Sequence, residues 1–220
     1  MEIHKEGWFV RGCTDSSDGN AKEPLARQKA LEKAGLDFNN LVTCKQVHGG
    51  NIAEINDAGR KLWEGYDGLI TSVTGVITGI FAADCAPVLI AEEKRKVLGN
   101  FHAGRRGVYG EIVKKGVAIL NKNWNAEPAN MKAFVGPHIL ECCYFVGSDV
   151  AELFPEECKR TFSGKISLSL QKAIVRQLLD AGLSQNNIFE NKKCTCCGSG
   201  FYSYRRDKTE KRMLSFAVII

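Results

Sequence analysis

Three residues in the sequence have side chains that together could hold a catalytic metal ion: His48, Cys85 and His102. Each stands where a run of apolar residues gives way to Gly- or Pro-containing sequence, so each can project from a strand end into a shared cleft. Two imidazoles and one thiolate suit zinc, and three ligands leave the fourth tetrahedral position for water or substrate. The residue types indicate a catalytic zinc site. Their spacing alone leaves open that both histidines and the cysteine are ordinary buried residues.

Several charged residues could act on a substrate beside such a site. Two arginine pairs, Arg105-Arg106 at a predicted helix start and Arg205-Arg206 after the aromatic Phe201-Tyr-Ser-Tyr, could hold phosphate, as could Arg11 at the end of the first predicted strand. Asp84 could accept a proton or orient a ligand histidine. We therefore take Asp84 and Arg106 as candidate catalytic residues, and Arg11, Arg106, Arg205 and Arg206 as candidate phosphate-binding residues. Each arginine pair could equally be a solvated surface pair, and Asp84 could equally cap a turn.

The remaining cysteines give a weaker signal. The chain has nine cysteines, and an odd number in a long chain without an export signal favours free thiols, metal ligands or reactive groups over a disulfide scaffold. Cys142, Cys143, Cys194, Cys196 and Cys197 form a second group. Adjacent cysteines rarely both reach one tetrahedral ion, and no matched C-x-x-C pair exists. We therefore expect structural or incidental thiols here rather than a metal site.

Length and composition set the class of protein. The chain has 220 residues, 44% of them hydrophobic and 25% charged, which is ordinary globular usage and predicts one domain over residues 1–220. The N-terminus lacks the apolar core of a signal peptide, and no stretch approaches the roughly 18 apolar residues of a membrane span, so we expect a cytoplasmic protein without membrane contact. The net charge of +5 suits anionic substrates but is too weak and scattered to indicate nucleic-acid binding.

Periodicity predicts the elements that must position these residues. Helices are predicted over 21–34, 108–120, 148–154 and 166–178. Strands are predicted over 8–10, 41–47, 51–55, 75–83, 87–91, 96–101, 131–135 and 213–220, with a charged turn over 205–212. The continuous apolar strands must be covered on both faces. His102 should lie in the turn after its strand, with the start of the next helix pointing at the metal cleft.

Six segments of the chain, taken together and in order, resemble one family. They are Lys45-Gln-Val-His-Gly, Tyr66-Asp-Gly-Leu-Ile-Thr, Ala83-Asp-Cys-Ala-Pro-Val-Leu, Phe101-His-Ala-Gly-Arg-Arg-Gly, Gly136-Pro-His-Ile with Cys142-Cys-Tyr-Phe-Val-Gly, and Phe201-Tyr-Ser-Tyr-Arg-Arg-Asp. The resemblance is to the purine nucleoside phosphorylase family once labelled multicopper polyphenol oxidase or laccase domain, which includes the bacterial YfiH proteins. It covers nearly the whole chain. Arg105 and Glu141 replace the Trp and Pro that are usual in the family, which affects the expected shape of the substrate pocket.

The resemblance implies a fold, a cofactor and an activity. The fold is α+β, a single domain of mixed β-sheets sandwiched between helices in α/β/β/α layers. The cofactor is one catalytic zinc ion bound by His48, Cys85 and His102, with copper less favoured. The activity is phosphorolysis of adenosine, inosine, guanosine and methylthioadenosine, together with adenosine deamination. The partners are purine nucleosides and phosphate, and the oligomeric state, including a homo-oligomer, is left open.

Three other functions are weighed against this one. The first is a copper-dependent polyphenol oxidase, which four histidines in the whole chain can hardly support. The second is a cysteine or zinc hydrolase acting on a peptidoglycan precursor, with Cys85 as nucleophile. The third is a non-catalytic binding module stabilised by zinc, which requires a fourth protein ligand.

Overall fold

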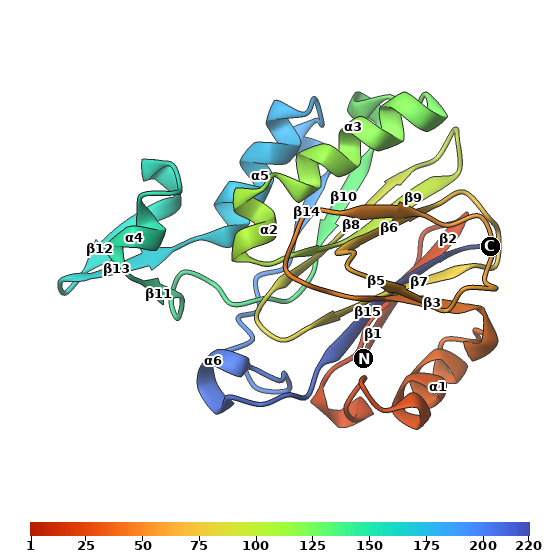
Figure 1. The fold of residues 1–220 in the computed structure, drawn as a ribbon, viewed down its shortest axis with the longest axis horizontal. Coiled ribbons are helices and arrows are strands. Elements are labelled where there is room, and N and C mark those ends of the chain that lie inside the picture. Colours follow the sequence, from red (N-terminus) through yellow and green to blue (C-terminus); the bar gives the residue numbers. More distant parts are fainter.

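Two six-stranded sheets form the body of the protein, and helices lie on either side of the pair (Figure 1). The computed structural model describes residues 1–220. The first sheet contains β1 (Glu2–Lys5), β2 (Phe9–Cys13), β15 (Met213–Ile219), β7 (Ile77–Ala82), β3 (Leu41–Lys45) and β5 (Leu62–Glu64), in that spatial order. The second contains β14 (Ile188–Glu190), β10 (Lys132–Val135), β8 (Ala86–Glu92), β9 (Val97–Ala103), β6 (Gly68–Thr71) and β4 (Ile52–Glu54), in that order.

Both sheets are mixed. In the first sheet β3 runs parallel to β7 and to β5, while β15 is antiparallel to both β2 and β7. In the second sheet β8, β9 and β10 pair antiparallel, and β14 and β4 add parallel edges. The expected α+β class, with mixed sheets between helices in a single domain, is confirmed.

Apolar side chains fill three layers around these sheets. Between the sheets, Phe9 and Ile219 of the first sheet meet Leu89 and Phe134 of the second. On the outer face of the first sheet, α1 (Pro24–Lys33) packs Leu31 against a further apolar cluster. On the outer face of the second sheet lies the largest cluster, to which the long helices contribute. Every residue of β8 and β9 is buried, as their largely apolar sequences require.

The helices on the second sheet differ in two ways from the expected ones. The helix predicted over 108–120 is two helices, α2 (Arg105–Tyr109) and α3 (Ile112–Trp124), because Glu111 adopts a left-handed backbone with φ of 58° and interrupts them. The helix predicted over 166–178 begins later, as α5 (Leu170–Asp180), and Ser169 caps it by accepting a hydrogen bond from Lys172 N–H.

A small third sheet was not predicted. It consists of β11 (Phe145–Val146), β13 (Lys165–Leu168) and β12 (Lys159–Phe162), all antiparallel, and lies with α4 (Ser148–Ala151) to one side of the main body (Figure 1). Its hairpin turns at Ser163-Gly164, both with positive φ. The charged turn expected over 205–212 begins instead with a short helix, α6 (Tyr204–Asp207).

The strands deliver the three metal-ligand candidates to one end of the sheets. His48 follows β3, Cys85 occupies the turn between β7 and β8, and His102 is the penultimate residue of β9. The expectation that His102 lies in a turn is wrong, because His102 pairs with Pro87 inside the β8–β9 ladder.

None of the helices described above has the length and the apolar composition that a membrane-spanning helix needs.

Candidate metal centre

His48, Cys85 and His102 come together in the folded chain. One ligand atom from each lies within 4.8 Å of the others, and the two imidazole rings meet edge to face with centroids 4.8 Å apart. His102 is buried, Cys85 is partly exposed and His48 is exposed. The group therefore opens to solvent on one side, as a catalytic site must.

Asp67, immediately before β6, organises two of these ligands. Its fully buried carboxylate accepts a hydrogen bond from His102 Nδ1 at 2.8 Å and from the backbone N–H groups of Val47, His48 and Gly49 at 3.1, 2.9 and 2.7 Å. These bonds support the left-handed backbone of His48, whose φ is 60°. With Nδ1 of His102 bound to Asp67, Nε2 is the nitrogen free to bind a metal.

Asp67 is a site residue that was not predicted from the sequence. The signal was present in the segment Tyr66-Asp-Gly-Leu-Ile-Thr, where a charged residue directly precedes a wholly buried strand. A carboxylate at such a position requires several hydrogen-bond donors. Nothing in the linear sequence indicates that the loop of His48 supplies three of them.

The electrostatics of the site favour an ionised cysteine. Burial acts to raise the pKa of the Cys85 thiol, but the positive charge and hydrogen bond of His102, with a hydrogen bond from His48, lower the pKa to about 6. Burial acts to lower the pKa of His102, but the Cys85 thiolate and the Asp67 carboxylate raise the pKa to about 9. Burial also acts to raise the pKa of Asp67, and hydrogen bonds from His102 and Gly49 keep that pKa below its usual value. The thiolate is the form of cysteine that binds metals.

The backbone around the group fits a small ion. A Cβ atom added to Gly104 would lie 2.8 Å from Cys85 Sγ and 3.3 Å from the His48 ring, so any larger residue would push the ligands apart. Gly104 thus keeps the sulfur and the imidazole in reach of one another. The residues present fit a zinc ion held by two nitrogen donors and one sulfur donor.

The three residues open into a cavity of about 750 Å³, which is large enough for a nucleoside-sized ligand. Its wall carries aromatic rings from Phe81, Tyr144 and Tyr204. Five cationic side chains also line it, namely Lys22, Arg27, Lys45, Arg205 and Arg212. The cavity is therefore electropositive and partly aromatic.

Asp84 lines this cavity, but both of its carboxylate oxygens are engaged. Oδ1 accepts a hydrogen bond from the Thr195 hydroxyl at 2.7 Å, and Oδ2 accepts one from the Arg205 backbone N–H at 2.6 Å. Its backbone is left-handed, with φ of 79°. Asp84 therefore holds residues 195–205 beside the cavity. The sequence suggested that Asp84 acts on substrate, whereas these hydrogen bonds give it a positioning role.

The structure brings only one of the four candidate phosphate-binding arginines into the cavity. Arg205 lines it, with its guanidinium 5.1 Å from the centre of the Tyr144 ring. Arg106 is exposed and does not line the cavity. Arg206 donates hydrogen bonds to the backbone carbonyls of Thr195, Cys196 and Phe201, so its guanidinium fixes a loop.

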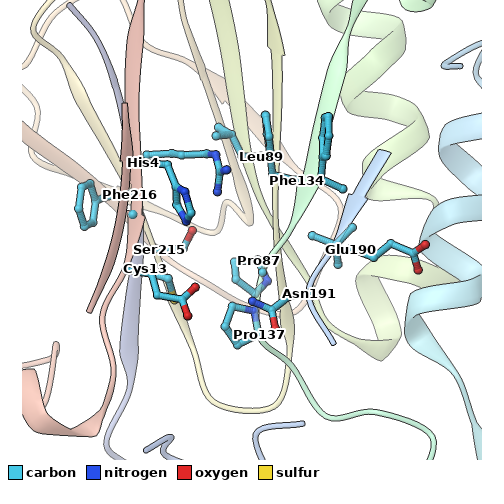
Figure 2. A pocket seen from close by; sticks show the side chains of 16 residues that line it. His4, Cys13, Pro87, Leu89, Phe134, Pro137, Glu190, Asn191, Ser215 and Phe216 are labelled. Carbon is cyan, nitrogen blue, oxygen red and sulfur yellow. The ribbon is translucent and has the colours of Figure 1, made fainter. Parts of the chain in front are cut away.

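Arg11 lies in a different depression, between β2 and β15 of one sheet and β8 and β10 of the other. Figure 2 shows this depression with His4, Ser215, Pro87 and Phe134 around it. There Arg11 pairs with Glu6 at 2.8 Å and stacks on the Phe134 ring. The fold does not bring Arg11 to the metal-ligand group.

The fold and the site together define a single-domain α+β protein with an open His-Cys-His group in a basic cavity. The chain belongs to the multi-copper polyphenol oxidoreductase laccase family, whose model matches residues 13–220. The chain is 30% identical to the purine nucleoside phosphorylase YlmD of Geobacillus stearothermophilus, with 94% of this chain and 89% of that protein covered. It is also 30% identical to the adenosine deaminase RL5 of an unknown prokaryotic organism, with 90% and 81% covered.

Solved structures of relatives share the fold. A hypothetical protein YfiH of Bacillus licheniformis superposes with a TM-score of 0.89 at 25% identity, covering 96% of this chain and 93% of that one. YlmD of Geobacillus stearothermophilus superposes with the same TM-score at 29% identity, covering 97% and 92%. The resemblance seen in the sequence is confirmed.

Replacing Asp67 by asparagine should weaken zinc binding about 10- to 100-fold, the usual effect of losing a partner that orients a ligand histidine. The amide keeps the shape of the side chain but lacks the negative charge that orients and polarises His102. Competition with a chromophoric chelator measures the affinity. Asp180→Asn, an exposed change on α5, is the matched control, and equal affinities in the two variants would contradict the role assigned to Asp67.

Alkylation of Cys85 should depend on pH and on zinc. In metal-free protein a thiol with a pKa of about 6 should react with iodoacetamide at a rate that is nearly constant above pH 7 and falls as the pH drops through 6. Burial raises the pKa of Cys13 to about 12, so its rate should still be rising at pH 9. Peptide mapping by mass spectrometry measures both residues in one sample.

Zinc-loaded protein should protect Cys85 from the reagent, since a thiolate bound to zinc is not free to attack. Labelling of Cys85 at the same rate with and without zinc would count against it as a ligand and would favour a nucleophilic cysteine.

Proposed function

We propose that the protein is a zinc-dependent purine nucleoside phosphorylase that also deaminates adenosine. The substrates would be adenosine, inosine, guanosine and methylthioadenosine, each split by phosphate into free base and a ribose 1-phosphate. The observation that carries this proposal is the cavity itself, in which one open metal-ligand group faces both aromatic rings and a set of cationic side chains. The relatives named as purine nucleoside phosphorylases and as an adenosine deaminase support it.

The lining supplies what each part of the substrates needs. A purine base is flat and apolar on its faces, and Phe81, Tyr144 and Tyr204 offer rings on which it can stack. Phosphate needs charge-assisted hydrogen bonds, which guanidinium groups provide best. Arg27 lines the cavity, and its guanidinium is held in place because Nη1 donates hydrogen bonds to the Ala21 and Lys22 carbonyls.

Phosphorolysis is mainly a matter of positioning. A phosphate oxygen attacks C1′ of the ribose, the bond from C1′ to the purine nitrogen breaks, and the base leaves with the bonding electrons. The cationic wall would hold the phosphate dianion next to C1′, and the aromatic wall would fix the base, so that the reacting atoms meet in line. Arg205 is suited to this because its guanidinium lies 5.1 Å from the centre of the Tyr144 ring and is held by a hydrogen bond to the Phe145 carbonyl.

His48, Cys85 and His102 would hold the zinc ion, and the bound ion would supply Lewis-acid activation of water or of a substrate oxygen. Asp67 would keep His102 in the tautomer with its proton on Nδ1. Deamination consumes water and needs no phosphate, so one cavity can serve both reactions.

The alternatives fit the geometry less well. A multicopper oxidase needs many imidazole ligands, and only two of the four histidines reach this group, since His4 lies on β1 and His138 is buried against the Gly136 carbonyl. A binding module closed by zinc needs a fourth ligand, and the group contains three. A hydrolase using Cys85 as nucleophile is the strongest rival, and the zinc dependence of Cys85 alkylation separates the two.

Purified zinc-loaded protein should convert adenosine to adenine when phosphate is present, and to inosine whether or not phosphate is present. Chromatography of the products distinguishes the two reactions. His48→Ala should lower both rates by at least about 100-fold, the upper end of the effect of losing even an outer partner of a metal ligand. A protein that carries its zinc yet leaves all four nucleosides unchanged in phosphate would refute the proposal.

Replacing Arg205 by methionine should raise the KM for phosphate about 10- to 100-fold, in line with the loss of a hydrogen bond to a charged group. The KM for water-dependent deamination of adenosine should change much less. Arg11→Met is the matched control, because Arg11 lies in the other depression and should leave the phosphate KM unchanged. The reverse pattern, with Arg11 important and Arg205 neutral, would show that phosphate binds elsewhere.

A further inference from the structure

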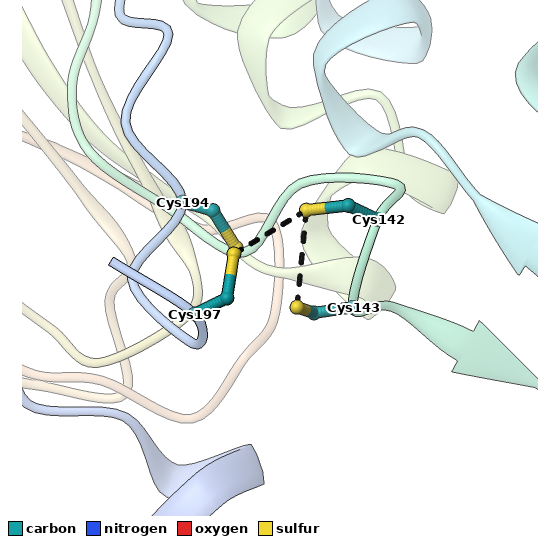
Figure 3. A group of neighbouring side chains, drawn as sticks. All are labelled: Cys142, Cys143, Cys194 and Cys197. Carbon is teal, nitrogen blue, oxygen red and sulfur yellow. Dashed lines mark hydrogen bonds between the residues drawn. The ribbon is translucent and has the colours of Figure 1, made fainter. Parts of the chain in front are cut away.

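Four cysteines far from the His48 group meet at a single point. Cys142 and Cys143 lie in a turn that follows β10, and Cys194 and Cys197 lie in the loop after β14. Figure 3 shows the four side chains with their sulfur atoms turned toward one another. All four sulfurs lie within 4.8 Å of each other. Adjacent cysteines rarely both reach one point, yet Cys142 and Cys143 do so here, because the Cys143 and Tyr144 N–H groups both donate to the Leu140 carbonyl and form a tight turn.

The spacing of the sulfurs matches a metal site. The Sγ atoms of Cys142 and Cys197 are 3.7 Å apart, and those of Cys142 and Cys143 are 3.8 Å apart. Four sulfurs placed tetrahedrally around zinc at about 2.3 Å would be about 3.8 Å from one another. A disulfide would require about 2.05 Å. Two of the six sulfur pairs are thus at the edge length of a zinc tetrahedron, the others lie within 4.8 Å, and all four cysteines are free thiols.

The surroundings can stabilise a cluster of thiolates. The buried Cys194 sulfur accepts a hydrogen bond from the Leu140 backbone N–H at 3.4 Å. Lys192 lines the same depression as Cys142, Cys194 and Cys197, and Lys193 lines it while paired with Glu2. Four thiolates around a divalent cation carry a net charge of −2, and a backbone donor such as the Leu140 N–H offsets part of this charge. Cys194 and Cys197 have C-x-x-C spacing, the common arrangement for one half of a zinc site, and the adjacent Cys142 and Cys143 take the place of the second C-x-x-C that the sequence lacks.

We propose that Cys142, Cys143, Cys194 and Cys197 bind a second zinc ion in a closed structural site, separate from the His48, Cys85 and His102 group. With four thiolate ligands no coordination position remains for substrate, so this ion would join two segments of chain and would not take part in chemistry.

The segments that this site would join both reach the cavity. Tyr144, which lines the cavity, directly follows Cys143. Thr195, which directly follows Cys194, donates its hydroxyl hydrogen bond to Asp84. The His138 carbonyl accepts a hydrogen bond from the Thr195 N–H at 3.0 Å, so the loop after β14 is also joined to the segment that leads to Cys142. A zinc ion at the four cysteines would thereby hold the Tyr144 and Asp84 sides of the cavity at a fixed separation.

Zinc analysis of the full-length protein and three variants tests the proposal. Protein prepared under reducing conditions with zinc should contain about two zinc ions per chain. His48→Ala should keep about one, and X-ray absorption of that remaining zinc should show four sulfur neighbours at about 2.3 Å. The double variant Cys142→Ser with Cys197→Ser should lose the second ion and keep the first. Cys196→Ser, in the same loop but outside the cluster, is the matched control and should keep both.

His48→Ala leaves the four cysteines intact, so the test stands even if the double cysteine variant does not fold. A metal-free His48→Ala protein would overturn the proposal, as would a remaining zinc with fewer than four sulfur neighbours. A disulfide between these cysteines in the reduced, zinc-supplied protein would do the same. Failure of nucleoside turnover leaves this result unaffected, because neither measurement depends on activity.

Discussion

The geometry of the metal centre depends on one buried carboxylate. Asp67 is inaccessible to solvent and accepts hydrogen bonds from His102 and from three consecutive backbone N–H groups of the Val47–Gly49 loop. The loop runs from β3 of the first sheet to β4 of the second, and His102 lies on β9 of the second, so Asp67 fixes the loop relative to the strand that carries His102. An apolar residue at this position would leave three N–H groups and one imidazole without a partner.

A second carboxylate, Asp84, performs a similar task next to Cys85. Asp84 joins the turn before β8 to Thr195 and to the start of α6, and so brings Arg205 to the cavity wall. Both Asp84 and His48 have left-handed backbones, a conformation that costs free energy and persists only where surrounding bonds fix it. Two ligand candidates, His48 and Cys85, therefore lie in or beside strained turns that buried carboxylates hold, whereas the third, His102, lies on the rigid strand β9.

The sequence predicts the parts of this structure that depend on local pattern. The long apolar strands, α1 and the stripe of α3 follow from periodicity, and the three metal-ligand candidates follow from residue type and their position at strand ends. The sequence does not predict which arginines reach the cavity, because Arg11 and Arg206 have local partners, Glu6 and a set of loop carbonyls, that only the folded chain reveals. The third sheet was missed because its strands have at most four residues and because Ile166 of β13 continues the apolar spacing of α5, which favoured a helix there. Convergence of Cys142 and Cys143 with Cys194 and Cys197 likewise depends on contacts between distant segments.

The order of strands in the first sheet has a consequence for biosynthesis. β15, at residues 213–219, lies between β2 and β7 and is the sole link between them within that sheet. The ribosome must therefore have made nearly the whole chain before β2 can join the sheet. Until then β2 and β7 each present an unpaired edge, which is the kind of surface that chaperones shield during translation.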